Sequence, residues 1–186
     1  GKLEVSVQGA FLRVVNVVAL ESYLQGVVAG EMPYSWPTEA LKAQAVAARS
    51  YALANLVKGK PYDLYADVRS QVYMGVAGEK PSTTEAVQGT AGEAVLYEGK
   101  VASTLYFSSS GGKTANAADV FGAPVPYLLS RPDPWDKGSP YFRWGPVLLG
   151  ARTVQSKLGT DARVIDARVA PTPSGRIRSL VLSTLA

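Results

Sequence analysis

An alanine-rich segment bounded by prolines sets the first constraint on the fold. Residues 38–57 follow Pro37, precede Gly59 and Pro61, and include seven alanines. Proline suits the first turn of a helix, and alanine is the strongest helix former. We therefore expect a helix from Pro37 to about Val57. With small residues on several faces, this helix should be buried and packed closely on both sides.

Two polar side chains inside this helix need partners. Gln44 and Arg49 lie among the alanines, and a buried charge without a partner is strongly unfavourable. Two interpretations of Arg49 stay open at this point. It forms a structural ion pair, or it binds an acidic group of a ligand.

A shorter helix is expected just before, from Glu21 to Met32, where Pro33 ends it. Its apolar residues recur at helical spacing and predict one buried stripe. They are Tyr23, Leu24, Val27 and Val28. Gly26 and Gly30 lie one turn apart and allow another element to approach the backbone closely.

Glu31 places a carboxyl group at the end of this shorter helix, near Val27, Val28 and Trp36. The negative end of the helix dipole and apolar neighbours both favour the protonated form. We therefore expect Glu31 to hold its proton more tightly than a carboxyl group in water does, which suits a general acid. The alternative is a solvated glutamate at a helix end, which is common in proteins.

Segments rich in β-branched residues predict three hairpins. Their strands are 3–7 with 11–18, 93–97 with 100–107, and 163–170 with 176–182. Along 100–107, one face should pack while the other, with Thr104 and Tyr106, can line a cleft. Ser82 and Glu85 predict a capping box for a short helix reaching Gln88, and another short helix is expected at 152–158. The composite is α+β, with a mixed, mainly antiparallel sheet and a buried alanine-rich helix, in one domain over 1–186.

Cysteine and histidine are both absent. This excludes a cysteine nucleophile, a Ser-His-Asp triad, an imidazole base and the usual zinc sites. Any chemistry therefore depends on carboxylates, tyrosine, lysine or arginine. The net charge of +4 favours anionic partners, but the scattered basic residues form no nucleic-acid-binding face. The longest apolar run, 14–20, is too short to span a bilayer, so we expect membrane attachment only through a signal or anchor that has been removed.

Several motifs, in one order along nearly the whole chain, resemble the SpoIID/LytB family. They are Leu20–Leu24, Gly26–Pro33, Ala40–Tyr51, Gln71–Tyr73, Ser108–Gly112 and Pro126–Leu128, with a fitting turn at Ser174–Arg176. The family contains a sporulation lytic transglycosylase and proteins named amidase enhancers. The resemblance implies cleavage of peptidoglycan glycan strands, peptide-free ones in our expectation, between N-acetylmuramic acid and N-acetylglucosamine. The products would carry 1,6-anhydro ends. The alternative is a non-catalytic module that binds wall glycan and enhances a partner amidase.

The resemblance also implies a site. The glutamate of the family's Glu-Met-Pro motif is the catalytic acid, which falls on Glu31, and no cofactor is implied. A glycan-binding cleft would hold Glu31 together with further substrate-binding residues. These are Arg49, Gln71, Tyr73, Tyr106, Ser108, Ser109, Ser110 and Thr114. Arg49 would bind a substrate carboxyl group, the tyrosines would contact sugar rings, and the hydroxyl groups would bind the glycan. The implied location is outside the cytoplasmic membrane.

The chain departs from the family pattern at two places. Some members carry a Cys/His metal site just before the Gln-Val-Tyr motif, where this chain has Arg69 and Ser70. We therefore expect no metal, and a loop over 59–73 held by packing alone. The chain also ends at Ala186, where family members usually continue, so part of the C-terminal end of the domain is expected to be missing.

Overall fold

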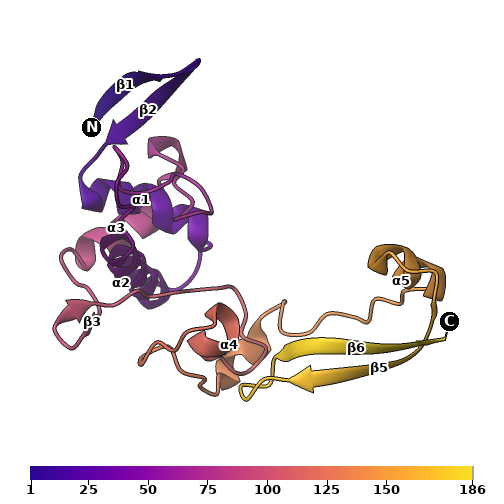
Figure 1. Ribbon diagram of the computed structural model, residues 1–186. Coiled ribbons are helices and arrows are strands. Elements are labelled where there is room, and N and C mark those ends of the chain that lie inside the picture. Colours follow the sequence, from indigo (N-terminus) through magenta and orange to yellow (C-terminus); the bar gives the residue numbers. More distant parts are fainter. Residues whose placement is uncertain (186) are drawn as a thin grey trace. The chain divides into compact units, whose positions relative to one another are not determined.

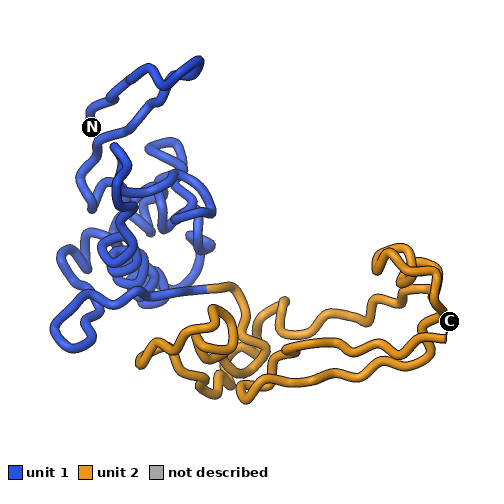
Figure 2. The backbone as a smooth tube through the Cα atoms, viewed as in Figure 1, with its two compact units in different colours: residues 1–106 blue, residues 107–186 orange. Residues whose placement is uncertain are grey.

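The computed structural model describes residues 1–185, in two compact units. The first unit comprises residues 1–106 and the second begins at Phe107 (Figure 2). Each unit has its own elements and is described by itself. A single domain over the whole chain stays a prediction.

Three helices form the centre of the first unit: α1 (Leu20–Glu31), α2 (Thr38–Ala54) and α3 (Pro81–Gly89). They pack side by side (Figure 1). The stripe expected on α1 is buried and contributes half of the core. The core residues are Tyr23, Leu24, Val27, Val28, Ala45, Ala48, Ala52 and Val87. The helices expected at 21–32 and 37–57 are thus confirmed, the second ending three residues early.

Helix α2 is buried over much of its length. Its buried residues are Leu41, Gln44, Ala45, Ala48, Arg49, Ser50 and Ala52. Helix α2 contacts α1 and α3, and also β4. Ser50 accepts the Val95 N–H, and the Ala47 carbonyl oxygen accepts from Thr104. The helix is therefore packed on more than one side, as expected, although Ala43 and Ala54 are exposed.

Arg49 of α2 forms a buried ion pair with Glu21 of α1. The Arg49 side chain is 1% exposed. Its Nε and Nη2 donate to the two Glu21 carboxylate oxygens at 2.8 and 2.7 Å. Nη1 donates to the carbonyl oxygen of Glu93 at 3.0 Å, and Nη2 also reaches that of Val87 at 3.3 Å. Of the two interpretations of Arg49, this geometry supports the structural one.

A loop segment, 72–75, lies directly on α1 at its two glycines. The Met74 N–H donates to the Gly26 carbonyl oxygen at 3.0 Å. A Cβ on Gly26 would lie 2.8 Å from Cε2 of Tyr73, and one on Gly30 would lie 3.0 Å from the Val72 carbonyl oxygen. The close approach expected at these glycines is therefore real, and the 72–75 segment is the element that approaches.

The strands form three separate antiparallel hairpins. They are β1 (Lys2–Gln8) with β2 (Phe11–Val17), β3 (Leu96–Tyr97) with β4 (Lys100–Val101), and β5 (Arg163–Pro171) with β6 (Ile177–Leu185). The α+β class is confirmed. Among residues 1–185, however, strands pair only within their own hairpins, so the expected single sheet does not form there.

The strands expected at 93–97 and 100–107 are mostly absent. The Ala102 N–H still donates to the Val95 carbonyl oxygen at 2.8 Å, but beyond it the chain bonds to α2 and to Asn55, which follows α2. The Thr104 hydroxyl donates to the Ala47 carbonyl oxygen at 2.6 Å, and Asn55 Nδ2 donates to Ser103 Oγ at 2.9 Å. Side-chain bonds to a helix replace the expected ladder, so the alternation of faces ends at β4.

The capping box expected at Ser82 is also wrong. Helix α3 begins one residue earlier, with Pro81 in its first turn and Lys80 at the N-cap. The Ser82 hydroxyl instead donates to the carbonyl oxygen of Tyr34 at 2.7 Å. Ser82 therefore connects α3 to the turn that follows α1.

The loop before the 72–75 segment is held by more than packing. Arg69 pairs with Asp67 at 2.6 Å, and its guanidinium lies 3.9 Å above the centre of the Tyr65 ring. Ser70 Oγ accepts the Tyr65 N–H at 3.1 Å. Arg69 and Ser70 therefore hold the loop by polar contacts, which corrects the expectation of packing alone.

The second unit is built on the β5–β6 hairpin, with short helices at α4 (Ala117–Phe121), η2 (Pro134–Gly138) and α5 (Ala151–Leu158). Residues 122–146 are irregular except for η2, a 3-10 helix, and an isolated bridge from Pro132 to Lys113. A second 3-10 helix, η1 (Val76–Gly78), lies in the first unit. The helix expected at 152–158 and the final hairpin are confirmed. Over residues 1–185, the helices are too short or too polar to cross a membrane.

The ion pair predicts a pH-dependent stability. Hydrogen bonding to Arg49 is the largest effect holding the pKa of Glu21 below its usual value. The ionised pair therefore stabilises the fold above about pH 4.3, the ordinary pKa of a glutamate in the unfolded chain. This contribution is lost as the pH falls through the lower pKa that Glu21 has in the folded protein. Because Glu21 is partly exposed, Glu21→Gln should lower the free energy of unfolding by about 1–3 kcal/mol at pH 7.

Urea unfolding between pH 3 and 7 measures the free energy of unfolding of the wild type and the variant. The wild type should lose more stability than the variant on acidification, and parallel curves would contradict this. Glu39→Gln, at an exposed pair with Lys42, is the matched control.

The close contact between Gly26 and the Tyr73 ring predicts that a larger side chain at position 26 destabilises the fold. Gly26→Ala places a methyl group against the Tyr73 ring and should lower the free energy of unfolding by about 1–3 kcal/mol through overpacking. Gly89→Ala is the control, because the nearest atom there is 3.8 Å from the new Cβ. Thermal unfolding of both variants measures the difference. Equal melting temperatures for the two variants would contradict the packing of 72–75 on α1.

Candidate functional site

Glu31 is the last residue of α1 and is half-buried. Its Oε1 accepts the backbone N–H of Val72 at 2.8 Å. The contact of 72–75 with Gly26 and Gly30 is what brings this donor to Glu31.

Gln71, the residue before Val72, lies at the centre of a hydrogen-bond network and is 1% exposed. Its Oε1 accepts the hydroxyl proton of Tyr23 at 3.2 Å. Its Nε2 donates to the hydroxyl oxygen of Tyr106 at 2.9 Å and to the carbonyl oxygen of Ala48 at 3.2 Å. The network joins α1, α2 and the two loop segments that carry Gln71 and Tyr106.

Tyr106 is the third tyrosine of this region. Burial raises the pKa of Tyr106 to about 12 against the lowering effect of the hydrogen bond from Gln71, and the negative charge of Glu31 acts in the same direction as burial. Burial is also the main effect that raises the pKa of Tyr23. Both phenols therefore keep their protons at neutral pH and are available as hydrogen-bond donors.

Tyr73 and Arg49 have other partners. The Tyr73 ring stacks on Tyr23, with centroids 5.2 Å apart, and its hydroxyl accepts from Asn16 Nδ2 at 3.0 Å. Arg49 is engaged with Glu21 and backbone carbonyls, as described above. Among the site residues expected in the first unit, the structure brings together Glu31, Gln71 and Tyr106, with Tyr73 next to them through Tyr23.

The expected serines lie in the second unit and differ in their surroundings. Ser108 is exposed. Ser109 Oγ donates to Asp136 Oδ2 at 2.9 Å, and Ser110 Oγ donates to Asp133 Oδ2 at 2.9 Å. Two of the three hydroxyl groups therefore bond to carboxylates of their own unit.

Asp136 is the acceptor around which this serine-glycine loop is arranged. Besides Ser109, the backbone N–H groups of Gly111 and Gly112 donate to its Oδ2 at 2.7 and 3.2 Å. Burial raises the pKa of Asp136, but these hydrogen bonds outweigh it, so the pKa lies below its ordinary value. The carboxylate is thus a stable part of the loop.

Thr114, the last expected residue, bonds to the backbone of a neighbouring segment. Its hydroxyl donates to the Leu129 carbonyl oxygen at 3.2 Å and accepts the Arg131 N–H at 2.8 Å. In the same region, Arg176 donates to the carbonyl oxygens of Ser110 and Lys113, each at 2.6 Å. These bonds tie the 110–114 loop to the final hairpin.

Two of these contacts were not expected from the sequence. The Val72 donor is a backbone group, so no side-chain identity marks it. Asp136 is one of several aspartates in loops. The sequence feature that could have indicated its contact is the pair Gly111-Gly112, because the free N–H groups of successive glycines suit a carboxylate.

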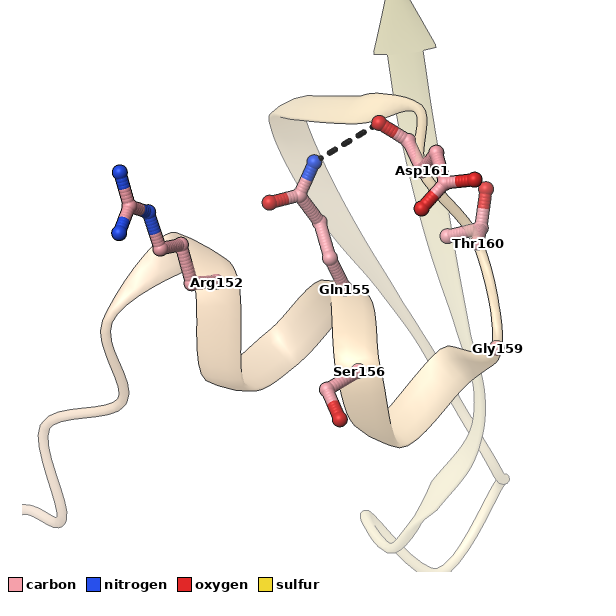
Figure 3. A pocket seen from close by; sticks show the side chains of 6 residues that line it. All are labelled: Arg152, Gln155, Ser156, Gly159, Thr160 and Asp161. Atoms are coloured by element: carbon pink, nitrogen blue, oxygen red, sulfur yellow. Dashed lines mark hydrogen bonds between the residues drawn. The ribbon is translucent and has the colours of Figure 1, made fainter.

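Two cavities in the described residues lie elsewhere. One, of about 840 Å³, lies between the β1–β2 hairpin and the 60–69 loop, and its lining includes Tyr62, Tyr65 and Tyr73. The other, of about 370 Å³, lies beside α5 in the second unit, where Gln155 Nε2 donates to the Asp161 carbonyl oxygen at 3.0 Å (Figure 3). Neither is lined by Glu31. Residues 1–185 also hold no group of three carboxylates placed for a metal ion.

Comparison with known proteins gives the family. Residues 8–97 match the SpoIID family model, described as stage II sporulation protein. Stage II sporulation protein D of Bacillus amyloliquefaciens is 32% identical over 91% of this chain and 55% of its own length. The amidase enhancer of Bacillus subtilis is 40% identical over 65% of this chain and 16% of its own length.

An uncharacterised protein of Brachyspira hyodysenteriae is 44% identical over 62% of this chain and 32% of its own length. The chain thus spans about half or less of the length of these curated relatives. The matched range contains Glu31, Gln71 and the helices that position them. The resemblance of the motifs is confirmed, and residues 8–97 belong to the SpoIID family.

Proposed function

We propose that this chain carries the catalytic site of a peptidoglycan lytic transglycosylase. A cell-wall-related function follows from the family and from relatives named stage II sporulation protein D and amidase enhancer. The observation that carries the finer proposal is the half-buried Glu31 carboxyl group, held by the Val72 N–H and next to the Tyr106 hydroxyl. A fixed, partly desolvated carboxyl group is what proton transfer to a glycosidic oxygen requires.

One carboxyl group suffices for this reaction. Ordinary glycosidases need a second carboxyl group to attack the sugar or activate water. Here Glu31 gives its proton to the oxygen of the glycosidic bond, and the bond from C1 of the muramic residue to that oxygen breaks. The 6-hydroxyl of the same residue then attacks C1, and the Glu31 carboxylate takes the hydroxyl proton. Glu31 returns to its starting form, water is not consumed, and a 1,6-anhydro ring results.

The remaining expected residues receive different roles in this proposal. Tyr106, in the first unit, contacts a sugar ring of the glycan, and the exposed Ser108 hydroxyl, in the second unit, binds the glycan. Ser109, Ser110 and Thr114 shape the loop, because their hydroxyl groups already have partners within it. The substrate is the glycan strand outside the cytoplasmic membrane.

A second candidate function is a wall-glycan-binding module that enhances a partner amidase. The relative named amidase enhancer favours it. In that case the same cleft would bind glycan without proton transfer by Glu31. The two functions differ in their dependence on Glu31 and in their products.

Replacement of Glu31 by glutamine separates these candidates. Glu31→Gln keeps the side-chain size but removes the transferable proton, so lysis of peptide-free glycan strands should fall by roughly 10²–10⁴-fold. Mass spectrometry of the products should find 1,6-anhydro-muramic ends with the wild type. Sedimentation with insoluble glycan should find binding by the variant unchanged. Glu39→Gln, an exposed glutamate on α2, is the control for charge removal.

Other outcomes would assign a different function. Hydrolysed reducing ends would contradict the transglycosylase mechanism, and so would full lysis by Glu31→Gln. If the wild type binds glycan and stimulates an added N-acetylmuramoyl-L-alanine amidase without cleaving strands itself, the enhancer function is correct.

A further inference from the structure

We propose that the cavity of about 840 Å³ in the first unit is a second glycan-binding site, which binds a stretch of peptide-free strand through the free carboxylates of that strand. Glu31 does not line this cavity, so the site is separate from the candidate catalytic residue. The inference rests on the proposed function for the choice of glycan as the ligand. The charge and the aromatic lining of the cavity do not depend on that function.

The size and the walls of the cavity suit a short oligosaccharide. The walls come from strand β2, the beginning of α1, the end of α2 and the 60–69 loop. Ligand sites in proteins commonly have volumes of roughly 300–1,000 Å³. Apolar side chains in these walls are exposed, among them Leu53 at 41% and Leu56 at 48%. A ligand that covers them removes apolar surface from water, which favours binding.

Tyr62 contributes an aromatic ring that is supported from behind. The Arg69 guanidinium lies 3.9 Å above the centre of the Tyr65 ring, and the Tyr65 ring meets the Tyr62 ring edge-on, with centroids 5.2 Å apart. Arg69 is itself paired with Asp67 at 2.6 Å. A ring that is held in place binds a ligand at a low cost in entropy, and its apolar face suits the C–H face of a sugar ring.

The charged residues of the lining leave a net positive charge. They are Arg13, Lys60, Arg69, Glu4 and Asp63. The charge of Arg69 is balanced by Asp67. The charge of Glu4 is balanced by Lys2. Among residues 1–185, Arg13, Lys60 and Asp63 form no ion pair, which leaves two cations against one carboxylate. The lining therefore favours an anionic ligand.

Arg13 is the cation that gains most from such a ligand. It lies on β2 and is half-buried, whereas Lys60 is exposed. A half-buried guanidinium without a carboxylate partner has lost part of its hydration and has gained no charge-assisted hydrogen bond in return. A ligand carboxylate supplies that bond, and its two oxygens match the planar fork of arginine.

A peptide-free glycan strand carries a carboxylate of this kind on every second sugar. Where the stem peptide has been removed, the lactyl group of the muramic residue ends in a free carboxylate. An attached peptide converts this group to a neutral amide. The peptide-free strand therefore combines sugar rings for Tyr62 with anions for Arg13 and Lys60, and a strand that keeps its peptides offers the rings alone.

Tyr73 connects the cavity with the candidate catalytic site. It lines the cavity, and its hydroxyl accepts from Asn16 Nδ2 at 3.0 Å. It also directly follows Val72, whose N–H binds Glu31 at 2.8 Å. The two sites therefore share the 72–75 segment, and a strand bound in the cavity is held by the same segment that holds the catalytic carboxyl group.

Binding measurements test the inference without requiring cleavage. The probes are a tetrasaccharide with two free muramic carboxyl groups and the neutral tetramer of N-acetylglucosamine. They are titrated by calorimetry into the whole chain carrying Glu31→Gln, so that the strands stay intact. Arg13→Ala should weaken binding of the carboxylated probe by about tenfold, because a charge-assisted hydrogen bond is lost. Binding of the neutral probe should stay unchanged. Tyr62→Leu should weaken binding of both probes by about three- to tenfold.

Two further variants and one spectrum control for other causes. The matched control is Arg178→Ala, because Arg178 is an exposed arginine of β6 that lines neither cavity, and it should leave both affinities unchanged. Arg13→Lys keeps the charge and should restore part of the affinity, and it serves if Arg13→Ala does not fold. The ¹⁵Nε resonance of Arg13 should move when the carboxylated probe is added and stay in place with the neutral probe.

Several results would overturn the inference. Equal affinity for the two probes, an unmoved Arg13 resonance, or a loss for Arg13→Ala no larger than that for Arg178→Ala would each do so. Single-stranded DNA of matched charge, if bound as tightly as the carboxylated probe, would show a general anion site instead of a glycan site. If the wild type cleaves no glycan but the dependence on Arg13 holds, the proposed function fails and the second site stands. If it cleaves glycan and the dependence on Arg13 is absent, only the second site fails.

Discussion

The ion pair between Arg49 and Glu21 is the interaction on which the first unit depends. It joins α1 to α2, and the same guanidinium binds carbonyl oxygens at the end of α3 and beyond it. A guanidinium that is 1% exposed would destabilise the fold if it lost its acceptors. The ion pair therefore favours the register of the three helices in which all three guanidinium nitrogens have acceptors. The alanines of α2 allow α1 and α3 to approach it closely, and the hydrogen bonds of Arg49 favour one arrangement of these helices.

That register also determines the surroundings of Glu31. Once α1 is fixed against α2, the Gly26–Gly30 face of α1 is free to receive the 72–75 segment, and the carbonyl oxygen of Ala48 is placed to orient Gln71. The geometry of the candidate site therefore depends on the packing of α1 against α2. The glutamate comes from a helix end, but the Val72 N–H that it accepts comes from a segment about 40 residues further along the chain. Local sequence around Glu31 specifies none of this.

Sequence reasoning identified what depends on periodicity and local chemistry. The stripe of α1, the extent of α2, the outer hairpins and the short helix at α5 all follow from spacing between neighbouring residues. The β3–β4 hairpin was overestimated because Ser103 and Thr104 bond to α2, a tertiary preference that alternation of side chains does not reveal. Apart from Glu31, which its place at a helix end also indicated, the residues expected at the site were chosen from similarity to family motifs, which does not show what a residue contacts. Arg49, Gln71 and Ser110 were all expected to contact substrate, and each has its polar atoms bound within the protein.

The arrangement around Asp136 has a consequence for how the serine-glycine loop can recognise anything. Glycine N–H groups in such a loop are normally well suited to bind an anion. Here an internal carboxylate already occupies them, and hydrogen bonds stabilise its charged form. An incoming group would have to displace Asp136 to use these donors, and a neutral sugar hydroxyl is too weak an acceptor to compete with a carboxylate. The loop is therefore ordered before any ligand arrives, and what it offers to a neutral polymer is its exposed hydroxyl and carbonyl groups.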